Sequence, residues 1–155
     1  MENKIVKTIK KIAAQRVKTI IKGTVKFNQD GKCELEEWGG VYGFAVKLEQ
    51  NEIKDFFEKH CDPRRLRNNS KTWADWRCLG DGFYPLYWGY DINLGSRLRE
   101  HTKASRTVES IQLDRKEYLH GREVIYGAVF CSDREDVEKE LREIYFDIFK
   151  NDQLK

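Results

Sequence analysis

Residues 87–101, with the sequence YWGYDINLGSRLREH, carry most of the functional information in this chain. The stretch has the pattern of a strand end followed by a helix, with Asn93 suited to the N-cap because its side-chain oxygen can accept a hydrogen bond from an unpaired helix N–H. Arg97 and His101 are one helical turn apart, so both side chains project from the same face of this helix. A guanidinium and an imidazole that converge beside Tyr87 are suited to binding a phosphate group.

Two short triplets with a tyrosine and a glycine accompany this stretch, Gly40-Val41-Tyr42 and Tyr87-Trp88-Gly89. Together with Asn93 and Arg97, they resemble the GIY-YIG nuclease family, whose core has two short strands that carry such triplets, followed by a helix with an essential arginine. Arg97 lies at the family's usual offset from the second triplet, and His101 matches a histidine that some restriction and homing members carry. The resemblance implies catalytic roles for Tyr42, Tyr87, Arg97 and His101.

The spacing of the two triplets differs from that of the family, in which both strands usually belong to one hairpin. Tyr42 and Tyr87 are separated by 44 residues in this chain. Gly82-Phe83-Tyr84 also imitates the first triplet, but it nearly adjoins Tyr87 and leaves no room to reverse the chain between two paired strands. We therefore keep Tyr42 in the first core strand and interpret much of residues 49–83 as a long insertion between the first two core strands.

The resemblance also implies a metal-binding glutamate on the last helix. Apolar residues at helical spacing predict this helix over about residues 133–150. Glu138 fits best, because Leu141 and Tyr145 follow it at three and seven residues, as in the apolar pattern of family members; Glu135 is the second choice. A carboxylate suits a hard cation, so we expect Mg²⁺ or Mn²⁺ as the cofactor.

Hydrolysis of a phosphodiester needs a deprotonated water, a neutralised phosphoryl group and a stabilised leaving oxygen. In the implied site, Arg97 holds the non-bridging oxygens with its planar fork of donors. Tyr42 takes the proton of the water with help from the metal or from His101, because an ordinary phenol, with a pKa of about 10, stays protonated at neutral pH. Tyr87 positions the water or the phosphate. We expect both tyrosine hydroxyls to open into one cleft with Arg97, His101 and a carboxylate of the last helix.

The first 22 residues are strongly basic, with seven lysines and arginines against Glu2 alone, which gives a net charge of +6. The remaining residues carry 22 basic and 25 acidic side chains, a net charge of −3. Apolar residues from Ile5 to Ile21 recur with a roughly helical period and predict an amphipathic basic helix. Its basic face is a candidate for DNA contact, although a merely solvated face explains it equally well, and the lack of an aromatic anchor disfavours a membrane surface. The candidate DNA contacts here are Lys7, Lys10 and Lys11.

The other elements follow from turn and periodicity signals. We expect a hairpin at residues 25–35, a buried strand at 41–48, a helix at 49–60 and a further strand at 123–131. The sequence thus predicts an α+β fold in which a small three-stranded antiparallel core sheet is flanked by helices.

The insertion contains a basic stretch followed by two tryptophans, Trp73 and Trp76. Arginine pairs with phosphates or guanine edges, so at least one of these arginines is expected to contact nucleic acid. The candidates are Arg64, Arg65 and Arg67. The tryptophans are interpreted as the small core of the insertion, with stacking on bases as the alternative.

Length and composition fit a single domain over residues 1–155, because 39% apolar residues in a chain of this length can form a core of ordinary size. No apolar stretch approaches the roughly 20 residues that cross a bilayer and no signal-peptide pattern is present, so we expect a cytoplasmic protein without membrane contact. The four cysteines are scattered, with no Cys-x-x-Cys pair. We interpret them as reduced thiols, with a zinc site at His60 and Cys61 as the alternative.

The sequence therefore predicts a Mg²⁺-dependent endonuclease that acts on DNA, with a restriction-type role as one option. A homodimer would place one site on each DNA strand. Two other classes of function stay open. One is a nucleic-acid-binding module on the same fold that has lost hydrolysis, and the other is an interaction protein whose basic helix recruits an acidic partner or a second copy of itself.

Overall fold

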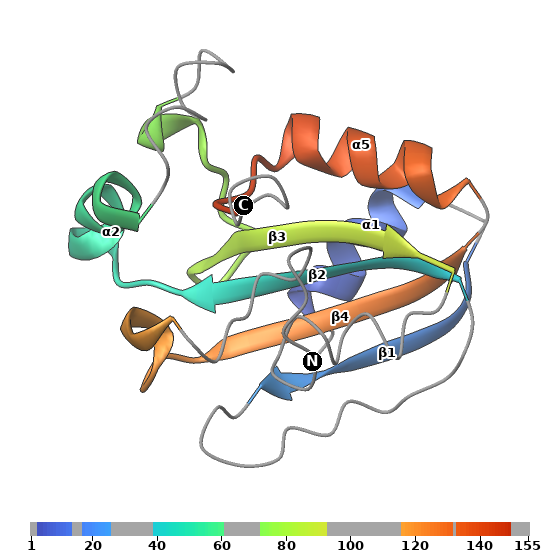
Figure 1. Ribbon diagram of the computed structural model, residues 1–155, viewed down its shortest axis with the longest axis horizontal. Coiled ribbons are helices and arrows are strands. Elements are labelled where there is room, and N and C mark those ends of the chain that lie inside the picture. Colours follow the sequence, from blue (N-terminus) through green and yellow to red (C-terminus); the bar gives the residue numbers. More distant parts are fainter. Residues whose placement is uncertain are drawn as a thin grey trace.

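The computed structural model in Figure 1 describes residues 3–13, 17–25, 39–60, 72–92, 116–131 and 133–149. Its centre is an antiparallel sheet whose strands follow the order β1-β4-β2-β3. The strands are β1 (Val17–Val25), β2 (Gly40–Lys47), β3 (Phe83–Asp91) and β4 (Val124–Cys131). In the described sheet, β2 therefore lies between β4 and β3, and β1 and β3 are the outer strands.

Three α-helices accompany the sheet in the described ranges, namely α1 (Lys4–Ala13), α2 (Ile53–His60) and α5 (Arg134–Ile144). Short 3-10 turns occupy residues 50–52, 73–75 and 117–119. Figure 1 shows α1 behind the sheet, α5 along its β3 side and α2 beyond one end. An antiparallel sheet with helices packed around it confirms the predicted α+β class.

The expected three-strand core is present as β2, β3 and β4, and β1 adds a fourth strand beside β4. β2 and β3 pair directly although residues 48–82 separate them in sequence. This segment contains α2, where the sequence predicted a helix. The long insertion between two neighbouring core strands is therefore a feature of the fold.

The predicted basic helix through Ile21 is wrong in its second half. The helix α1 ends at Ala13, and the backbone of residues 17–25 pairs with β4 from Val17 opposite Cys131 to Val25 opposite Val124. Most of residues 17–25 are valine, isoleucine or threonine, whose β-branched side chains favour extended backbone over helix. The hairpin expected at residues 25–35 falls almost entirely outside the described residues.

Both faces of the sheet are covered, so β2 is buried on each side. One face carries Tyr42 and Tyr87, packed with side chains of α2 and of residues 146–149; we call it the tyrosine face. The opposite face carries Val41 and Trp88, packed under α1 and α5; we call it the helix face. The two core clusters place successive residues of β2 on alternate sides, as expected for a strand. In β3 the alternation is interrupted at Leu86 and Tyr87, which share the tyrosine face beside the irregularity in the β2–β3 register.

Trp76 of the insertion belongs to the core of the tyrosine face. It is 5% exposed, and its ring stacks on Phe57 with centroids 4.7 Å apart. The interpretation of this tryptophan as a core residue is therefore confirmed, although it packs with the sheet and not only within the insertion. The side chain of Trp73 lies outside the description.

The last helix is shorter than the predicted residues 133–150. The helix α5 ends at Ile144, and residues 145–149 run beside β3. There the N–H groups of Ile148 and Phe149 donate to the carbonyl oxygens of Pro85 and Leu86 at 3.2 and 2.7 Å. Among the described helices, none has the length and apolar character required to cross a bilayer.

Gly43→Ala should destabilise the fold, because a Cβ at Gly43 would lie 2.5 Å from two ring carbons of Trp88. Overpacking of this kind lowers the free energy of unfolding by about 1–3 kcal/mol, which urea denaturation can measure. Trp88→Leu removes the obstructing ring carbons, so the double variant should be more stable than the sum of the two single effects. Strict additivity of the two substitutions would contradict the close contact.

Candidate functional site

The two triplets lie side by side on paired strands. In the β2–β3 ladder, Tyr42 is opposite Gly89 and Phe44 is opposite Tyr87. The rings of Tyr42 and Tyr87 therefore share the tyrosine face, with centroids 6.1 Å apart and ring planes at 39°. The tyrosines of the two triplets are thus neighbours in space despite their distance in sequence.

The glycine of the second triplet makes room for the tyrosine of the first. A Cβ at Gly89 would collide with the hydroxyl of Tyr42 and would lie 2.9 Å from Cε2 of Tyr87. Any larger residue at position 89 would displace one of the two rings. The Tyr-x-Gly pattern of β3 therefore has a steric reason that is independent of catalysis.

Both tyrosines are buried, with exposed fractions of 0% for Tyr42 and 1% for Tyr87. This burial differs from the expectation that their hydroxyls open into a cleft. A phosphate reaches these hydroxyls only after the side chains that cover them move aside. Arg97 and His101, the other expected cleft residues, lie outside the described residues.

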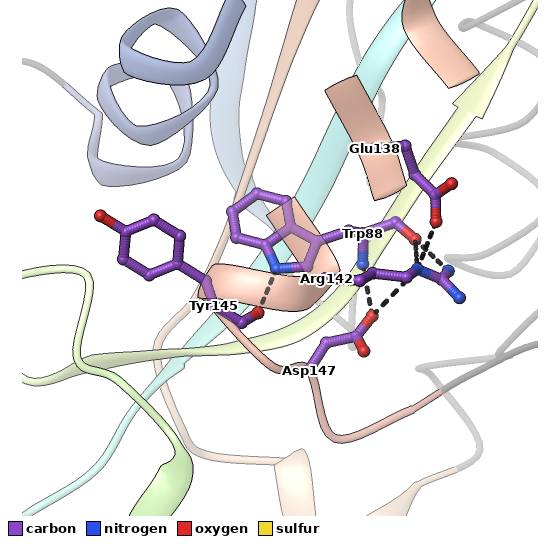
Figure 2. Close-up of polar contacts among 5 residues, drawn as sticks. All are labelled: Trp88, Glu138, Arg142, Tyr145 and Asp147. Atoms are coloured by element: carbon purple, nitrogen blue, oxygen red, sulfur yellow. Dashed lines mark hydrogen bonds and ion pairs between the residues drawn. The ribbon is translucent and has the colours of Figure 1, made fainter. Parts of the chain in front are cut away.

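Arg142 of α5 joins several parts of the fold beside β3 (Figure 2). Its guanidinium donates to the carbonyl oxygen of Trp88 through Nε, at 3.1 Å, and through Nη2. Its Nε also forms an ion pair with Oε1 of Glu138, one helical turn earlier, and lies 3.7 Å from Oδ2 of Asp147. Its Cζ lies 5.0 Å from the centroid of the Tyr87 ring. One guanidinium thus connects the expected metal ligand with the tyrosine of the second triplet.

Asp147 completes the contact between the C-terminal segment and β3. Its side chain is fully buried, and Oδ2 accepts a hydrogen bond of 2.8 Å from the backbone N–H of Trp88. The indole Nε1 of Trp88 donates to the carbonyl oxygen of Tyr145 at 2.7 Å. Because β3 is an outer strand of the described sheet, its outward backbone groups need partners other than a neighbouring strand. Arg142 and Asp147 supply them for both the C=O and the N–H of Trp88.

The surroundings of Arg142 favour its charged form. Burial by itself would lower the pKa of Arg142, but the carboxylates of Asp147 and Glu138, together with the nearby Tyr87 side chain, raise this pKa above its ordinary value. The guanidinium is therefore a cation that pairs with the Glu138 carboxylate and lies 3.7 Å from Oδ2 of Asp147.

Tyr90 extends this row of polar groups toward the start of α5. It is 40% exposed, and desolvation together with the nearby carboxylates of Glu135 and Glu138 raises the pKa of its phenol. Glu135, the alternative metal ligand, therefore lies near Tyr90, whereas Glu138 forms an ion pair with Arg142.

Glu138 brings one carboxylate to the candidate metal site, and its side chain is 13% exposed. Clusters of three or more His, Cys, Asp or Glu side chains that could hold a metal are absent from the described part of the chain. Mg²⁺ does not need such a cluster, since one or two carboxylates, waters and substrate phosphates commonly complete its shell. The donor chemistry of Glu138 therefore fits Mg²⁺ or Mn²⁺ as a single-carboxylate ligand.

The zinc alternative involves His60, whose ring stacks on Tyr118 with centroids 3.7 Å apart and planes at 6°. Desolvation and the nearby charges of Lys59 and Arg122 lower the pKa of His60. Its expected partner Cys61 lies outside the described residues. The described environment of His60 is thus an aromatic stack.

The lysines expected to contact DNA lie across the sheet from the two tyrosines. The side chains of Lys7, Lys10 and Lys11 are exposed on α1, and the apolar side of α1 packs on the helix face. Tyr42 and Tyr87 belong to the opposite face. The remaining candidates, Arg64, Arg65 and Arg67, lie outside the described residues.

Arg142 and Asp147 are the residues of this site that the sequence analysis missed. Arg142 had a signal, because it follows Glu138 by four residues, the order that favours an ion pair on a helix. Asp147 had none. A helix continued to residue 150 would have carried Asp147 onward along the helix axis, whereas the chain turns at Tyr145 and brings Asp147 to β3.

Comparison with protein-family models gave no match, and the searches of curated proteins and of solved structures found none either. The resemblance to GIY-YIG nucleases therefore rests on the residues of this chain.

Replacing Arg142 with an uncharged residue should destabilise the fold strongly, because buried Asp147 loses this cationic partner. We expect Arg142→Met to lower the free energy of unfolding, measured by urea denaturation, by about 3–5 kcal/mol. Adding Asp147→Asn should restore a large part of this loss, since the amide oxygen can still accept the Trp88 N–H while the buried charge is gone.

Lys59→Met is the control for this pair of variants. It breaks an ion pair with Asp55 that is 2.9 Å long and largely exposed, with 64% and 67% of the two side chains accessible. Its effect on the free energy of unfolding should stay within about 0.5 kcal/mol. Equal losses in Arg142→Met and in the double variant would show that the charge of Asp147 is not the cause.

Proposed function

We propose that this chain is a divalent-metal-dependent endonuclease that hydrolyses phosphodiester bonds of DNA. The main support is that Arg142 contacts both Glu138 and the ring of Tyr87, and that this ring packs beside Tyr42, so that residues of three separate segments are connected. Within the described residues, Tyr42, Tyr87 and Glu138 are the ones to which the GIY-YIG resemblance gives a role in the reaction. A chance match of two short triplets offers no reason for a glutamate of the last helix to share an arginine with the second tyrosine.

Each residue has a separate task in the proposed reaction. Tyr87 positions the attacking water or the scissile phosphate through its hydroxyl. Tyr42 takes the proton of the water as its own phenolic proton passes to His101, and Arg97 neutralises charge on the non-bridging oxygens. Glu138 would hold Mg²⁺, which would supply further charge neutralisation and stabilise the leaving oxygen.

The burial of the tyrosines supports a second candidate on the same fold. Tyr42 and Tyr87 are almost completely covered, and the carboxylate of Glu138 is ion-paired with Arg142. A nucleic-acid-binding module that does not hydrolyse DNA would tolerate both features, whereas an enzyme has to open this site to its substrate. Cleavage and binding assays on the same preparation separate the two candidates.

A plasmid-nicking assay with and without Mg²⁺ tests the proposal. Arg97→Ala should lower the rate on the order of 10²- to 10³-fold, the usual effect of losing one preorganised charge-stabilising donor. Glu138→Gln should abolish metal-dependent cleavage while DNA binding persists, because the amide keeps the shape and loses the charge that holds a hard cation. Glu140→Gln, an exposed position on the same helix, is the matched control and should cleave like the wild type.

One outcome would contradict the enzymatic proposal, and two others would revise or reject its metal ligand. DNA binding by the wild type without any Mg²⁺- or Mn²⁺-dependent nicking would favour the binding module. Equal rates for Glu138→Gln and the wild type, with loss of activity in Glu135→Gln, would move the metal ligand to Glu135. Loss in neither variant would reject a metal held by this helix.

The α1 lysines should act on DNA mainly through long-range attraction, since they lie across the sheet from the tyrosines. Lys7→Gln/Lys10→Gln/Lys11→Gln should weaken binding at low salt but reduce the slope of log affinity against log salt by less than about 1. Direct contact of all three lysines with phosphates would reduce it by roughly 2.7, at about 0.9 per contact. Substitution is preferable to deletion of α1, because Ile5 and Ile9 on the same helix are fully buried.

A further inference from the structure

We propose that Arg142 is the positioning residue of this site, which holds the Glu138 carboxylate and the Tyr87 side chain in a fixed relative place. The inference rests on the proposed metal-dependent function, because it concerns the orientation of the metal ligand. The family resemblance assigned no role to Arg142. Arg142 contacts the backbone of Trp88, the carboxylate of Glu138 and the ring of Tyr87.

The guanidinium is anchored on the backbone of β3 in addition to its contacts with the side chains of Glu138 and Tyr87. Both Nε and Nη2 donate to the carbonyl oxygen of Trp88, whose strand is held in register by β2. The same Nε pairs with Oε1 of Glu138. The carboxylate of Glu138 is therefore oriented relative to β3, which carries Tyr87, and not only relative to its own helix.

The guanidinium also lies over the ring of Tyr87, with Cζ 5.0 Å from the ring centroid. A cation over an aromatic face is attracted by the ring. Arg142 therefore holds the Tyr87 ring and the Glu138 carboxylate in a fixed relative place. In the proposed reaction this contact determines where the Tyr87 hydroxyl meets a phosphate oxygen or the attacking water.

A lysine at position 142 would distinguish the positioning of Glu138 by Arg142 from the effect of its positive charge. An ammonium group keeps the positive charge beside Asp147, but it lacks the planar fork that contacts the Trp88 carbonyl and the Glu138 carboxylate together. Arg142→Lys should therefore fold, while the orientation of Glu138 is lost. Arg142→Met would not make this separation, because it also removes the charge.

Arg122 offers a matched control elsewhere in the chain. Its Nη1 and Nη2 donate to Oε1 and Oε2 of Glu52 at 2.8 and 2.9 Å, and its Cζ lies 5.2 Å from the centroid of the Phe56 ring. Arg122 thus contacts a carboxylate and an aromatic ring, as Arg142 does, but no metal ligand is proposed at its site. Arg122→Lys therefore reproduces the chemical change without the proposed effect on the metal.

The test measures binding of Mn²⁺ alone, without DNA, by electron paramagnetic resonance, for the wild type, Arg142→Lys and Arg122→Lys. Residues that orient a metal ligand typically contribute about 10- to 100-fold in metal affinity. We expect Arg142→Lys to bind Mn²⁺ at least about tenfold more weakly than the wild type and Arg122→Lys to match the wild type. The Mg²⁺ concentration for half-maximal nicking should shift in parallel.

The outcomes distinguish this inference from the proposed function. Wild-type Mn²⁺ affinity in a folded Arg142→Lys variant would overturn the positioning role while leaving the nuclease proposal intact. Tighter Mn²⁺ binding in that variant would also overturn it, because Arg142 would then be a competitor of the metal for Glu138. A wild type that neither binds Mn²⁺ nor nicks DNA would reject the proposed function and this inference with it.

Discussion

The stability of this fold depends on the backbone N–H and C=O groups of Trp88. This residue lies on an outer strand of the described sheet, yet α5 and residues 145–149 cover it, so its N–H and C=O need protein partners. An unpaired buried polar group costs about 1–3 kcal/mol, a large share of the stability of a small domain. Asp147 accepts the N–H and Arg142 donates to the C=O, and these two charged groups also approach each other. The side chain of Trp88 then packs on the helix face, where it fills the space that Gly43 leaves open.

The central strand β2 explains why small residues recur near the site. It is covered on both faces, so a large side chain fits only where the residue opposite it on the paired strand is small. Gly43 leaves room for the ring of Trp88, and Gly89 leaves room for the hydroxyl of Tyr42. Pro85, which has no N–H to donate, lies on β3 at the irregularity in the β2–β3 register, a position that an outer strand tolerates.

The periodicity of apolar residues predicted most of the core strands and helices. It gave a wrong prediction where the local β-propensity of the residues favoured a strand. The alternation in residues 41–48 and 123–131 located β2 and β4 correctly, and the second triplet located part of β3. The helix expected through Ile21 failed because β-branched residues and pairing with β4 outweigh an approximate helical spacing. The two triplets predicted correctly that Tyr42 and Tyr87 lie on neighbouring strands. Asp147 was not predictable, because its place depends on the end of α5 at Ile144 and on a tertiary contact with Trp88.

The same contacts indicate which parts of the site can move. Val137 and Leu141 lie on either side of Glu138 in sequence, and both are buried in the core of the helix face, so α5 is anchored at both ends of this stretch. The segment that follows is held by Asp147 and by two backbone hydrogen bonds to β3. Displacement of α5 would break these interactions together, whereas rearrangement of side chains on the tyrosine face would break none of the backbone bonds to β3. In the proposed reaction, Tyr42 and Tyr87 would become exposed to the substrate through movement of side chains packed on the tyrosine face, with Arg142 and β3 remaining in place.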